Sequence, residues 1–234
     1  IVYEGSSVDV TTTPLTIDAG WNWISYLPQE SININTSLSS LSSSSGVGDY
    51  IKSQGGFADY YEGFGWYGTL ENMNPTEGYM LFVNTSGTLV YPESGSLSIA
   101  SNDQSFSRHF NEFDYNNYEF NGSATIALEL SEANPEVGDK IKAYYNEELR
   151  GVAKGVICPL NNKLIFPMMF YGHDQNEELI FTYNNQFGEE IELLDRITFV
   201  PDMHLNDALD PYIMSDSHPL TYSLSDAYPN PFNP

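Results

Sequence analysis

Short runs of aromatic and β-branched residues, separated by Gly, Asn, Asp and Pro, make up most of this chain. Aromatic residues account for 14% of its 234 residues, and 17 of them are tyrosines. Such side chains favour extended backbone, whereas the residues between the runs favour turns. A chain interrupted so often has little room for long helices. The pattern therefore predicts a mainly β protein made of many short strands.

One run in the first hundred residues, at 16–26, alternates strongly. Beyond Gly20 the alternation places Trp21 and Trp23 on one face of a strand and Ile24 and Tyr26 on the other. One of these faces should be core, and we expect Trp21 or Trp23 to pack into it. Further strands are expected at 49–54, 57–61, 79–83 and 88–91.

A short helix is expected within 31–45, where Ile34, Leu38 and Leu41 recur at helical spacing in a Ser-rich stretch. Residues 94–104 have the small, polar composition of a linker. Strand-like runs resume after it, at 117–120, 123–130, 139–145, 149–157, 163–171, 178–184, 190–193 and 196–200.

Short strands in series, with turn residues between them, are typical of a β-sandwich. The two series of strands show no internal repeat, so two different β-rich domains are expected. The first, with one short helix, should span 1–98, and the second, a β-sandwich, should span 99–216. An extended, Pro-rich linker should follow over 217–234.

Acidic residues outnumber basic ones 32 to 8, which gives a formal net charge of −24. A chain so acidic repels nucleic acid and anionic membrane surfaces, so neither is expected as a partner. The acidity fits either divalent-cation binding or solubility in a salty medium. The single Cys158 excludes an internal disulfide, and its apolar neighbours indicate a buried thiol rather than a nucleophile.

The run Tyr228-Pro-Asn-Pro-Phe-Asn-Pro234 contains three prolines that fix φ and lack backbone donors, so it predicts an extended connector. Residues 227–234 also resemble the opening of the C-terminal sorting domain of proteins exported by the bacterial type IX secretion system. The resemblance implies a secreted or outer-surface location, with a sorting domain beyond residue 234. A generic Pro-rich linker is the alternative.

Both halves of the chain resemble modules that are found together in multidomain surface proteins of type IX secreting bacteria. The first half does so through residues 20–24 (GWNWI), 49–54 (DYIKSQ), 65–70 (GWYGTL) and 75–81 (PTEGYML). The second half does so through residues 138–144 (GDKIKAY), 148–153 (ELRGVA), 170–172 (FYG), 178–181 (ELIF) and 197–199 (ITF). Where that family usually has a Gly or Asn-Gly turn, this chain has Tyr145-Asn146-Glu147. The resemblance implies architecture and location, and it carries over no catalytic residue.

Familiar motifs of hydrolytic enzymes are missing from the sequence. The four histidines lie far apart and form no His-x-His or His-Glu-x-x-His pattern, which argues against a zinc hydrolase. The sequence has no Gly-x-Ser-x-Gly elbow and no phosphate-binding Gly-x-x-x-x-Gly-Lys loop. A glycosidase needs only two carboxylates close together in space, so the 32 acidic residues leave that reaction open.

The aromatic, acid-bearing stretch 57–67 is a candidate for binding sugar rings. Its flat rings could stack on a sugar while its carboxylates accept hydrogen bonds from hydroxyl groups. Alternatively, these aromatic residues belong to the core and to hairpin edges. The candidate ligand-binding residues are Asp59, Tyr60, Tyr61, Glu62, Trp66 and Tyr67.

The acidic stretch 202–210 is a candidate calcium site, with a solvated acidic turn as the alternative. Its oxygen ligands lack the spacing of an EF-hand, so any such site would be irregular. Arg150 lies inside a strand-like run, and we expect it to pair with an acid across a sheet. The candidate metal ligands are Asp202, Asn206, Asp207 and Asp210.

Taken together, these observations favour a non-catalytic, secreted cell-surface protein that serves in adhesion or as a structural module. Extended ends at 1–13 and 221–234 could add strands to neighbouring subunits and build a homo-oligomer or a polymer. The alternative is a carbohydrate-binding module of a type IX secreted polysaccharide-degrading enzyme. The expected partners are therefore other protein subunits or surface glycans.

Overall fold

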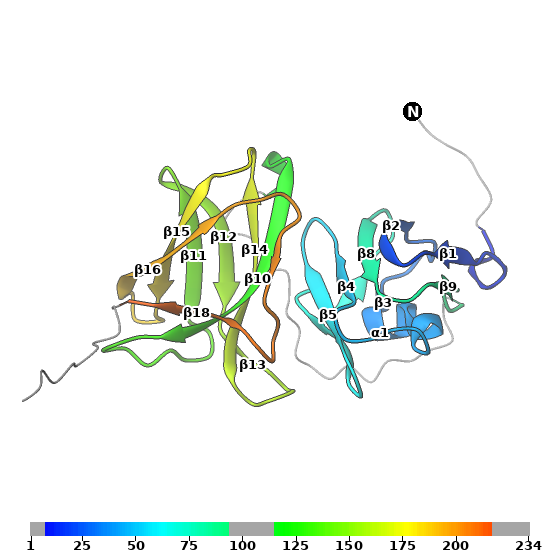
Figure 1. Ribbon diagram of the computed structural model, residues 1–234, viewed down its shortest axis with the longest axis horizontal. Helices are drawn as coiled ribbons and strands as arrows, with labels where there is room; N and C mark the ends of the chain where they lie inside the picture. Colours follow the sequence, from blue (N-terminus) through cyan, green and yellow to red (C-terminus); the bar gives the residue numbers. More distant parts are fainter. Residues whose placement is uncertain (1–7, 94–114, 217–234) are drawn as a thin grey trace, which may run out of the picture.

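The computed structural model describes residues 8–93 and 115–216, which form two β-rich units lying side by side (Figure 1). We call residues 8–93 the first unit and residues 115–216 the second unit. Strands dominate both units, so the predicted mainly β class is confirmed. The expected domain boundary at 98/99, the expected linker at 217–234 and the sorting-type run at 227–234 lie outside the described residues.

The first unit consists of short strands with brief helical turns between them. Its elements are η1 (Val10–Thr12), β1 (Leu15–Ile17), β2 (Gly20–Ser25), β3 (Ile32–Asn33), α1 (Ile34–Ser37), η2 (Ser39–Leu41), β4 (Tyr50–Lys52), β5 (Phe57–Tyr61), β6 (Gly65–Gly68), β7 (Asn72–Met73), β8 (Gly78–Val83) and β9 (Gly87–Leu89). Five strands form an antiparallel sheet in the order β2-β8-β4-β5-β6, and two small sheets pair β1 with β9 and β3 with β7.

The core of the first unit lies on one face of the five-stranded sheet, which we call the inner face. Ile24 and Tyr26 point into this core, which the small sheets and the helical turns close. The helix expected within 31–45 is confirmed as α1 followed by η2, and Ile34, Leu38 and Leu41 are all buried as their spacing predicted. Asn33 caps α1, because its side chain accepts a hydrogen bond from the backbone N–H of Asn35.

Both tryptophans of β2 lie on the opposite, outer face of the sheet and are exposed, Trp21 by 47% and Trp23 by 80%. The expectation that one of them packs into the core is wrong, although the alternation itself was predicted correctly. The core side of β2 is decided by the small sheets and helical turns, which pack on the face that Ile24 occupies. Trp21 instead rests against Phe82 of the neighbouring β8, with ring centroids 5.4 Å apart.

The second unit is formed by one large sheet. Its elements are η3 (Tyr115–Asn117), β10 (Phe120–Glu129), β11 (Lys140–Tyr145), β12 (Glu148–Lys154), β13 (Val156–Ile157), β14 (Leu164–Gly172), β15 (Glu178–Asn184), β16 (Glu190–Thr198), β17 (His204–Leu205) and β18 (Tyr212–Ser215). The strand order is β16-β15-β11-β12-β14-β10-β17, with β13 added to β14 and β18 added to β10.

Figure 1 shows that this sheet curls so that β18 lies close to β16. The apolar side chains of its concave face pack together inside. Phe166, Phe170, Phe181 and Phe199 are all fully buried. The two facing layers expected of a β-sandwich are thus supplied by one continuous curled sheet rather than by two separate sheets. A curled sheet encloses its core because each strand presents every second side chain to the inside.

Arg150 and Cys158 occupy the environments that the sequence predicted. Arg150 of β12 is buried, and its guanidinium forms ion pairs of 3.2 Å with Glu177 and 3.3 Å with Glu148. The ring of Tyr118 lies under the same guanidinium, 5.0 Å from its carbon. The Cys158 thiol is buried and forms no disulfide. Within residues 8–93 and 115–216, no helix has the length and apolar character needed to span a membrane.

Candidate functional site

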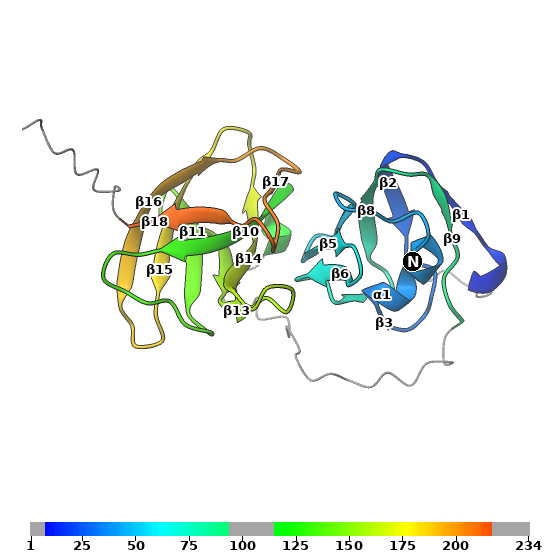
Figure 2. The same ribbon diagram turned by 60° about the horizontal axis from the view of Figure 1, so that its bottom comes forward.

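The outer face of the five-stranded sheet is divided between the second unit and solvent. Its β4 and β5 residues are buried under the second unit, whereas its β2 residues are exposed. Figure 2 shows β5 on the side of the first unit that faces the second unit, with β2 farther from it. The division follows from the sheet order, since β2 is an edge strand on the far side of β8. Side chains of this face form two cross-strand rows, Trp21–Phe82–Tyr50–Asp59–Tyr67 and Trp23–Met80–Lys52–Phe57.

Two apolar clusters join the first unit to the second. Each contains aromatic residues of β4 or β5 together with buried residues of the second unit, so the contact excludes water in the manner of a core. One cluster contains Tyr50, Phe57, Tyr118, Met169 and Tyr171. The other contains Tyr61, Cys158, Ile165 and Ala208. We refer to this contact region as the junction.

A buried lysine crosses the junction. Lys52 of β4 is only 2% exposed, and its ammonium donates hydrogen bonds to the side chains of Asn121 at 2.8 Å and Asp202 at 2.5 Å. Burial lowers the pKa of this ammonium, and the Asp202 carboxylate acts in the opposite direction. The second unit therefore supplies the charge and the acceptors that allow a lysine to be buried in this sheet face.

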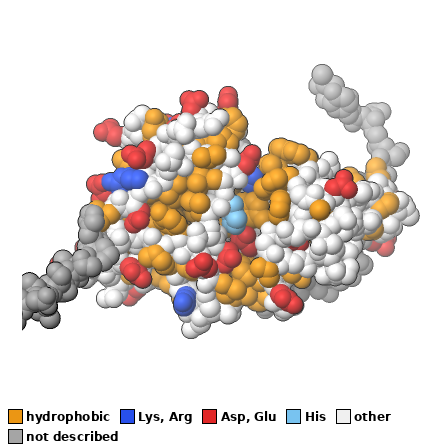
Figure 3. Space-filling view, viewed as in Figure 1, with side chains coloured by type: hydrophobic (Ala, Val, Ile, Leu, Met, Phe, Trp, Pro, Cys, Tyr) orange, Lys and Arg blue, Asp and Glu red, His pale blue; other side chains and the backbone are white. Residues whose placement is uncertain are grey.

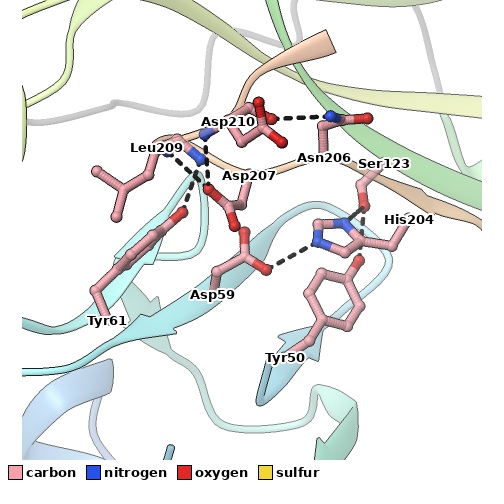
Figure 4. A network of polar contacts seen from close by, with 10 residues as sticks. Tyr50, Asp59, Tyr61, Ser123, His204, Asn206, Asp207, Leu209 and Asp210 are labelled. Atoms are coloured by element: carbon pink, nitrogen blue, oxygen red, sulfur yellow. Dashed lines mark hydrogen bonds and ion pairs between the residues drawn. The ribbon is translucent and has the colours of Figure 1, made fainter. Parts of the chain in front are cut away.

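A chain of four polar side chains also crosses the junction (Figure 4). The Tyr50 hydroxyl lies 2.8 Å from Ser123 Oγ, which lies 2.8 Å from Nδ1 of His204. His204 Nε2 lies 2.8 Å from Oδ1 of Asp59. With a neutral imidazole, Tyr50 donates to Ser123, Ser123 donates to Nδ1, and Nε2–H donates to the carboxylate. Every polar hydrogen of the chain then has an acceptor.

A pocket of about 440 Å³ opens beside this chain. The first unit contributes seven of its twelve lining residues, and the second unit contributes the others, from the β13–β14 loop, from β17 and from the loop after β17. Its lining includes two exposed apolar residues, Val47 from the first unit and Leu209 from the second. Its lining residues are Val47, Gly48, Tyr50, Asp59, Tyr60, Tyr61, Glu62, Leu160, His204, Asn206, Asp207 and Leu209. No lysine or arginine occurs among these described lining residues.

Two carboxylates from different units face each other in the pocket wall (Figure 4). Asp59 is mostly buried, and this burial raises the pKa of its carboxyl group. The hydrogen bond and charge of His204 oppose the shift, while the negative charge of Asp207 adds to it. Asp207 is held by its own turn, where Oδ1 accepts the backbone N–H groups of Leu209 and Asp210.

The structure brings together four of the six residues predicted to bind a ligand. Asp59, Tyr60, Tyr61 and Glu62 all line the pocket, but the expected exposed row of rings does not form. Trp66 is buried in the core of the first unit, with Tyr60 packed against it. The burial of Trp66 contradicts a platform that includes its ring and agrees with the alternative that these rings belong to the core and to hairpin edges. Side chains of the β5–β6 hairpin alternate between the two faces of the sheet. Tyr61 and Tyr67 therefore point to the junction, whereas Trp66 points away from it.

The predicted calcium ligands do not gather around one point. Asp202 is held by Lys52, while Asn206, Asp207 and Asp210 hydrogen-bond within a turn, as when Asn206 Nδ2 donates to the Asp210 carbonyl. Among the described residues, no three His, Cys, Asp or Glu side chains are placed to hold a metal ion. Calcium binding stays a prediction from composition, and the structure gives it no site within the part of the chain that it describes.

Ser123, His204 and Asp59 are the residue types of an acyl-transfer triad, but their geometry does not suit nucleophilic catalysis. A nucleophilic serine must be reached by substrate, whereas Ser123 is fully buried within β10 and is not part of the pocket lining. Its hydroxyl also lies within hydrogen-bond distance of both Tyr50 and His204, so it is held between two buried partners rather than presented to the pocket. The geometry therefore suits a structural link between the units.

Sequence reasoning missed three of the four residues in this hydrogen-bonded chain of side chains. Tyr50, Ser123 and His204 belong to no local motif, and they come together only because β4, β10 and β17 meet at the junction. The signal that could have suggested His204 is its position within the acidic stretch 202–210.

Comparison with protein-family models, curated proteins and solved structures found no match to this protein.

Proposed function

We propose that the chain is a non-catalytic recognition module of an exported surface protein, with its ligand site at the junction pocket. One observation carries the proposal. The side chains that could perform chemistry are used to join the two units, and the pocket beside them is lined by tyrosine rings and carboxylates. Such a lining can hold a ligand through ring contacts and hydrogen bonds without any reaction.

Export and a role in adhesion are supported by the sequence. The run 227–234 and the paired modules resemble parts of type IX secreted surface proteins, and the net charge of −24 suits a protein that stays soluble outside the cell. A tight interface between the two units also suits adhesion. A ligand held between them is released only when its own contacts break or when the junction opens. The interface is held by Lys52 and by the hydrogen-bonded chain that runs from Tyr50 to Asp59.

Recognition and catalysis are distinguished by one experiment. The full chain is incubated with a fluorophosphonate probe and with 4-nitrophenyl esters and glycosides, alongside Ser123→Ala and Asp207→Asn. We expect no labelling and no hydrolysis above the level of the variants, because Ser123 is fully buried. In parallel, oligosaccharides and peptides are titrated into isotope-labelled protein, and we expect shifts of the His204 and Leu209 resonances. Turnover that disappears in either variant would make the protein an enzyme.

A second candidate function is assembly, and the free edge of β2 favours it. Among the described strands β2 pairs only with β8, so one row of its backbone groups is left for another strand. The opposite edge of the sheet is protected, because Asn35 hydrogen-bonds both the N–H and the carbonyl of Trp66 in β6. Of the predicted N-terminal arm, the described residues include the 3-10 turn Val10–Thr12 rather than a strand.

Sedimentation velocity over a range of protein and salt concentrations tests assembly. Copies with a net charge of −24 repel one another, so association should strengthen as salt shortens the Debye length from about 10 Å at 0.1 M. Trp23→Lys places a charge on the β2 edge strand and should abolish the association. A protein that stays monomeric at high concentration and high salt contradicts the assembly role.

A further inference from the structure

The outer face of the first unit carries an exposed pair of tryptophans that nothing in the junction accounts for. Trp23 is 80% exposed, more than any other large hydrophobic residue described in this unit, and Trp21 is 47% exposed. Both project from the same side of β2, where residues two apart have Cα atoms about 7 Å apart along the strand. Exposed large apolar residues gathered on one face mark a place where something binds. We call this pair the tryptophan strip.

The tryptophan strip packs against a residue of the pocket wall. Trp21 contacts the Tyr50 ring edge-on, with centroids 6.0 Å apart, and Tyr50 lines the pocket. Phe82 lies between them in the same cross-strand row. One end of the row is thus covered by the second unit and the other is open. Hydrophobic side chains gather on both sides of the junction, with acidic side chains among them (Figure 3).

We infer that the tryptophan strip and the junction pocket together bind a neutral polysaccharide chain; the inference rests on the proposed recognition function and names its ligand. The faces of sugar rings are apolar C–H surfaces that stack on flat indole rings. Sugar hydroxyl groups find hydrogen-bond partners in the pocket, where Glu62 and Asp207 offer carboxylates and Asn206 offers an amide. Trp21 packs against Tyr50 of the pocket wall, so the two places are neighbours, and a linear chain can reach both.

Charge decides which polysaccharides fit. The pocket wall contains the carboxylates of Asp59, Glu62 and Asp207, and the described lining residues include no lysine or arginine. The net charge of −24 repels uronate-rich or sulfated chains in addition. A neutral chain suffers neither penalty, and its hydroxyl groups donate to the carboxylates. Two indole rings in a line along an edge strand also suit a long, extended ligand better than they suit the compact surface of a protein.

Affinity gel electrophoresis of the full chain tests the inference, with glucomannan, xyloglucan and hydroxyethyl cellulose as neutral probes and polygalacturonate as the anionic one. We expect retardation by at least one neutral probe and none by polygalacturonate. Trp23→Ala should weaken binding by about tenfold or more, because an exposed tryptophan anchor supplies contact area that alanine lacks. Trp23→Phe should retain part of the affinity, and Glu62→Gln should weaken it by a smaller factor.

The matched control is Phe187→Ala. Phe187 is 92% exposed in the turn between β15 and β16, so it tests whether any exposed aromatic residue produces retardation. We expect its affinity to equal that of the unaltered chain. Binding that survives Trp23→Ala, or that Phe187→Ala removes equally, overturns the inference, as does the absence of retardation by all neutral probes. If the protein binds a protein ligand instead, and Trp23→Ala removes that binding, the polysaccharide inference is overturned but the recognition function stands. Release of reducing sugar overturns the recognition function itself.

Discussion

Lys52 is a single side chain that links the two units. Its stem and ammonium are buried at the junction, and its hydrogen-bond partners Asn121 and Asp202 both belong to the second unit. Removing the side chain leaves a cavity and deprives a buried amide oxygen of its donor. We expect Lys52→Ala to lower the free energy of unfolding by roughly 2 to 4 kcal/mol.

Lys52→Met sharpens this prediction. Methionine keeps much of the stem volume and removes an ammonium whose burial is costly, so it should lose less stability than alanine does. Asp202 is half-exposed and stays hydrated after the change. Urea denaturation of both variants, with the exposed Lys154→Ala as a control, measures the difference. Equal losses for the methionine and alanine variants would show that the charge rather than the packing holds the junction.

Buried tyrosines give the protein a defined alkaline limit. Burial raises the pKa of Tyr50, Tyr61 and Tyr171 far above the ordinary value of 10.0, and it raises the pKa of Tyr118 to about 12. Above about pH 10 the unfolded chain releases tyrosine protons that the folded chain retains. The stability contributed by these groups is therefore complete below pH 10 and lost as pH rises. The lowered pKa of Lys52 acts oppositely, but it is one group against several.

The urea midpoint should accordingly fall steeply above about pH 10. Tyr171→Phe removes one of the titrating groups and one hydrogen bond, from the Tyr171 hydroxyl to the Gln54 carbonyl at 2.9 Å. This variant should be less stable at neutral pH and should lose stability less steeply at alkaline pH. An unchanged slope in Tyr171→Phe argues against tyrosine ionisation as the cause.

The β11–β12 hairpin makes its tight turn without glycine. Asn146 and Glu147 both adopt positive φ, 48° and 66°, in a two-residue loop of the kind that glycine usually serves. Asparagine tolerates this conformation, but glutamate is strained in it. The turn forms nevertheless, because β11 and β12 pair with each other and each is held by a further strand.

Glu147→Gly should relieve the strain and stabilise the second unit by up to about 1 kcal/mol. Asn146→Gly should change stability less, since asparagine already accepts a left-handed conformation. Thermal unfolding of both variants measures the effect. A melting temperature that falls in Glu147→Gly would mean that the greater freedom of glycine in the unfolded chain outweighs the relief of strain.

Each unit has a core of its own, yet the junction couples the two. The junction contains two apolar clusters, the Lys52 contacts and the Tyr50–Asp59 chain. We therefore expect the full chain to melt in a single transition. Residues 1–98 and 100–216, produced separately, should fold but melt at lower temperatures than the full chain, because each half exposes its side of the junction.

Differential scanning calorimetry of the full chain and of the two halves tests this coupling. Two separate transitions in the full chain, each matching one isolated half, would show that the junction adds no stability. Lys52→Ala supplies an internal check, since it should lower the melting temperature of the full chain more than that of residues 1–98. The isolated first half already exposes Lys52 to water, so the variant removes less from it.

The sequence by itself determined the features that depend on neighbours within a few residues. The short strands, the helix around Ile34 and Leu38, the buried Cys158 and the pairing of Arg150 all follow from local periodicity and composition. Local conformational preferences act along the chain, so such features can be predicted without knowing what packs above them. The alternation of β2 belongs to the same class.

Only the tertiary structure decided which face of each strand is covered and which distant residues meet. The inner face of β2 was fixed by the small sheets that pack on it, and Trp21 and Trp23 therefore remained outside. Asp59 meets His204 across 145 residues of sequence because a hairpin of one unit docks on the edge of the other. Such contacts depend on how complementary surfaces bury area together, and that property belongs to no single segment of the chain.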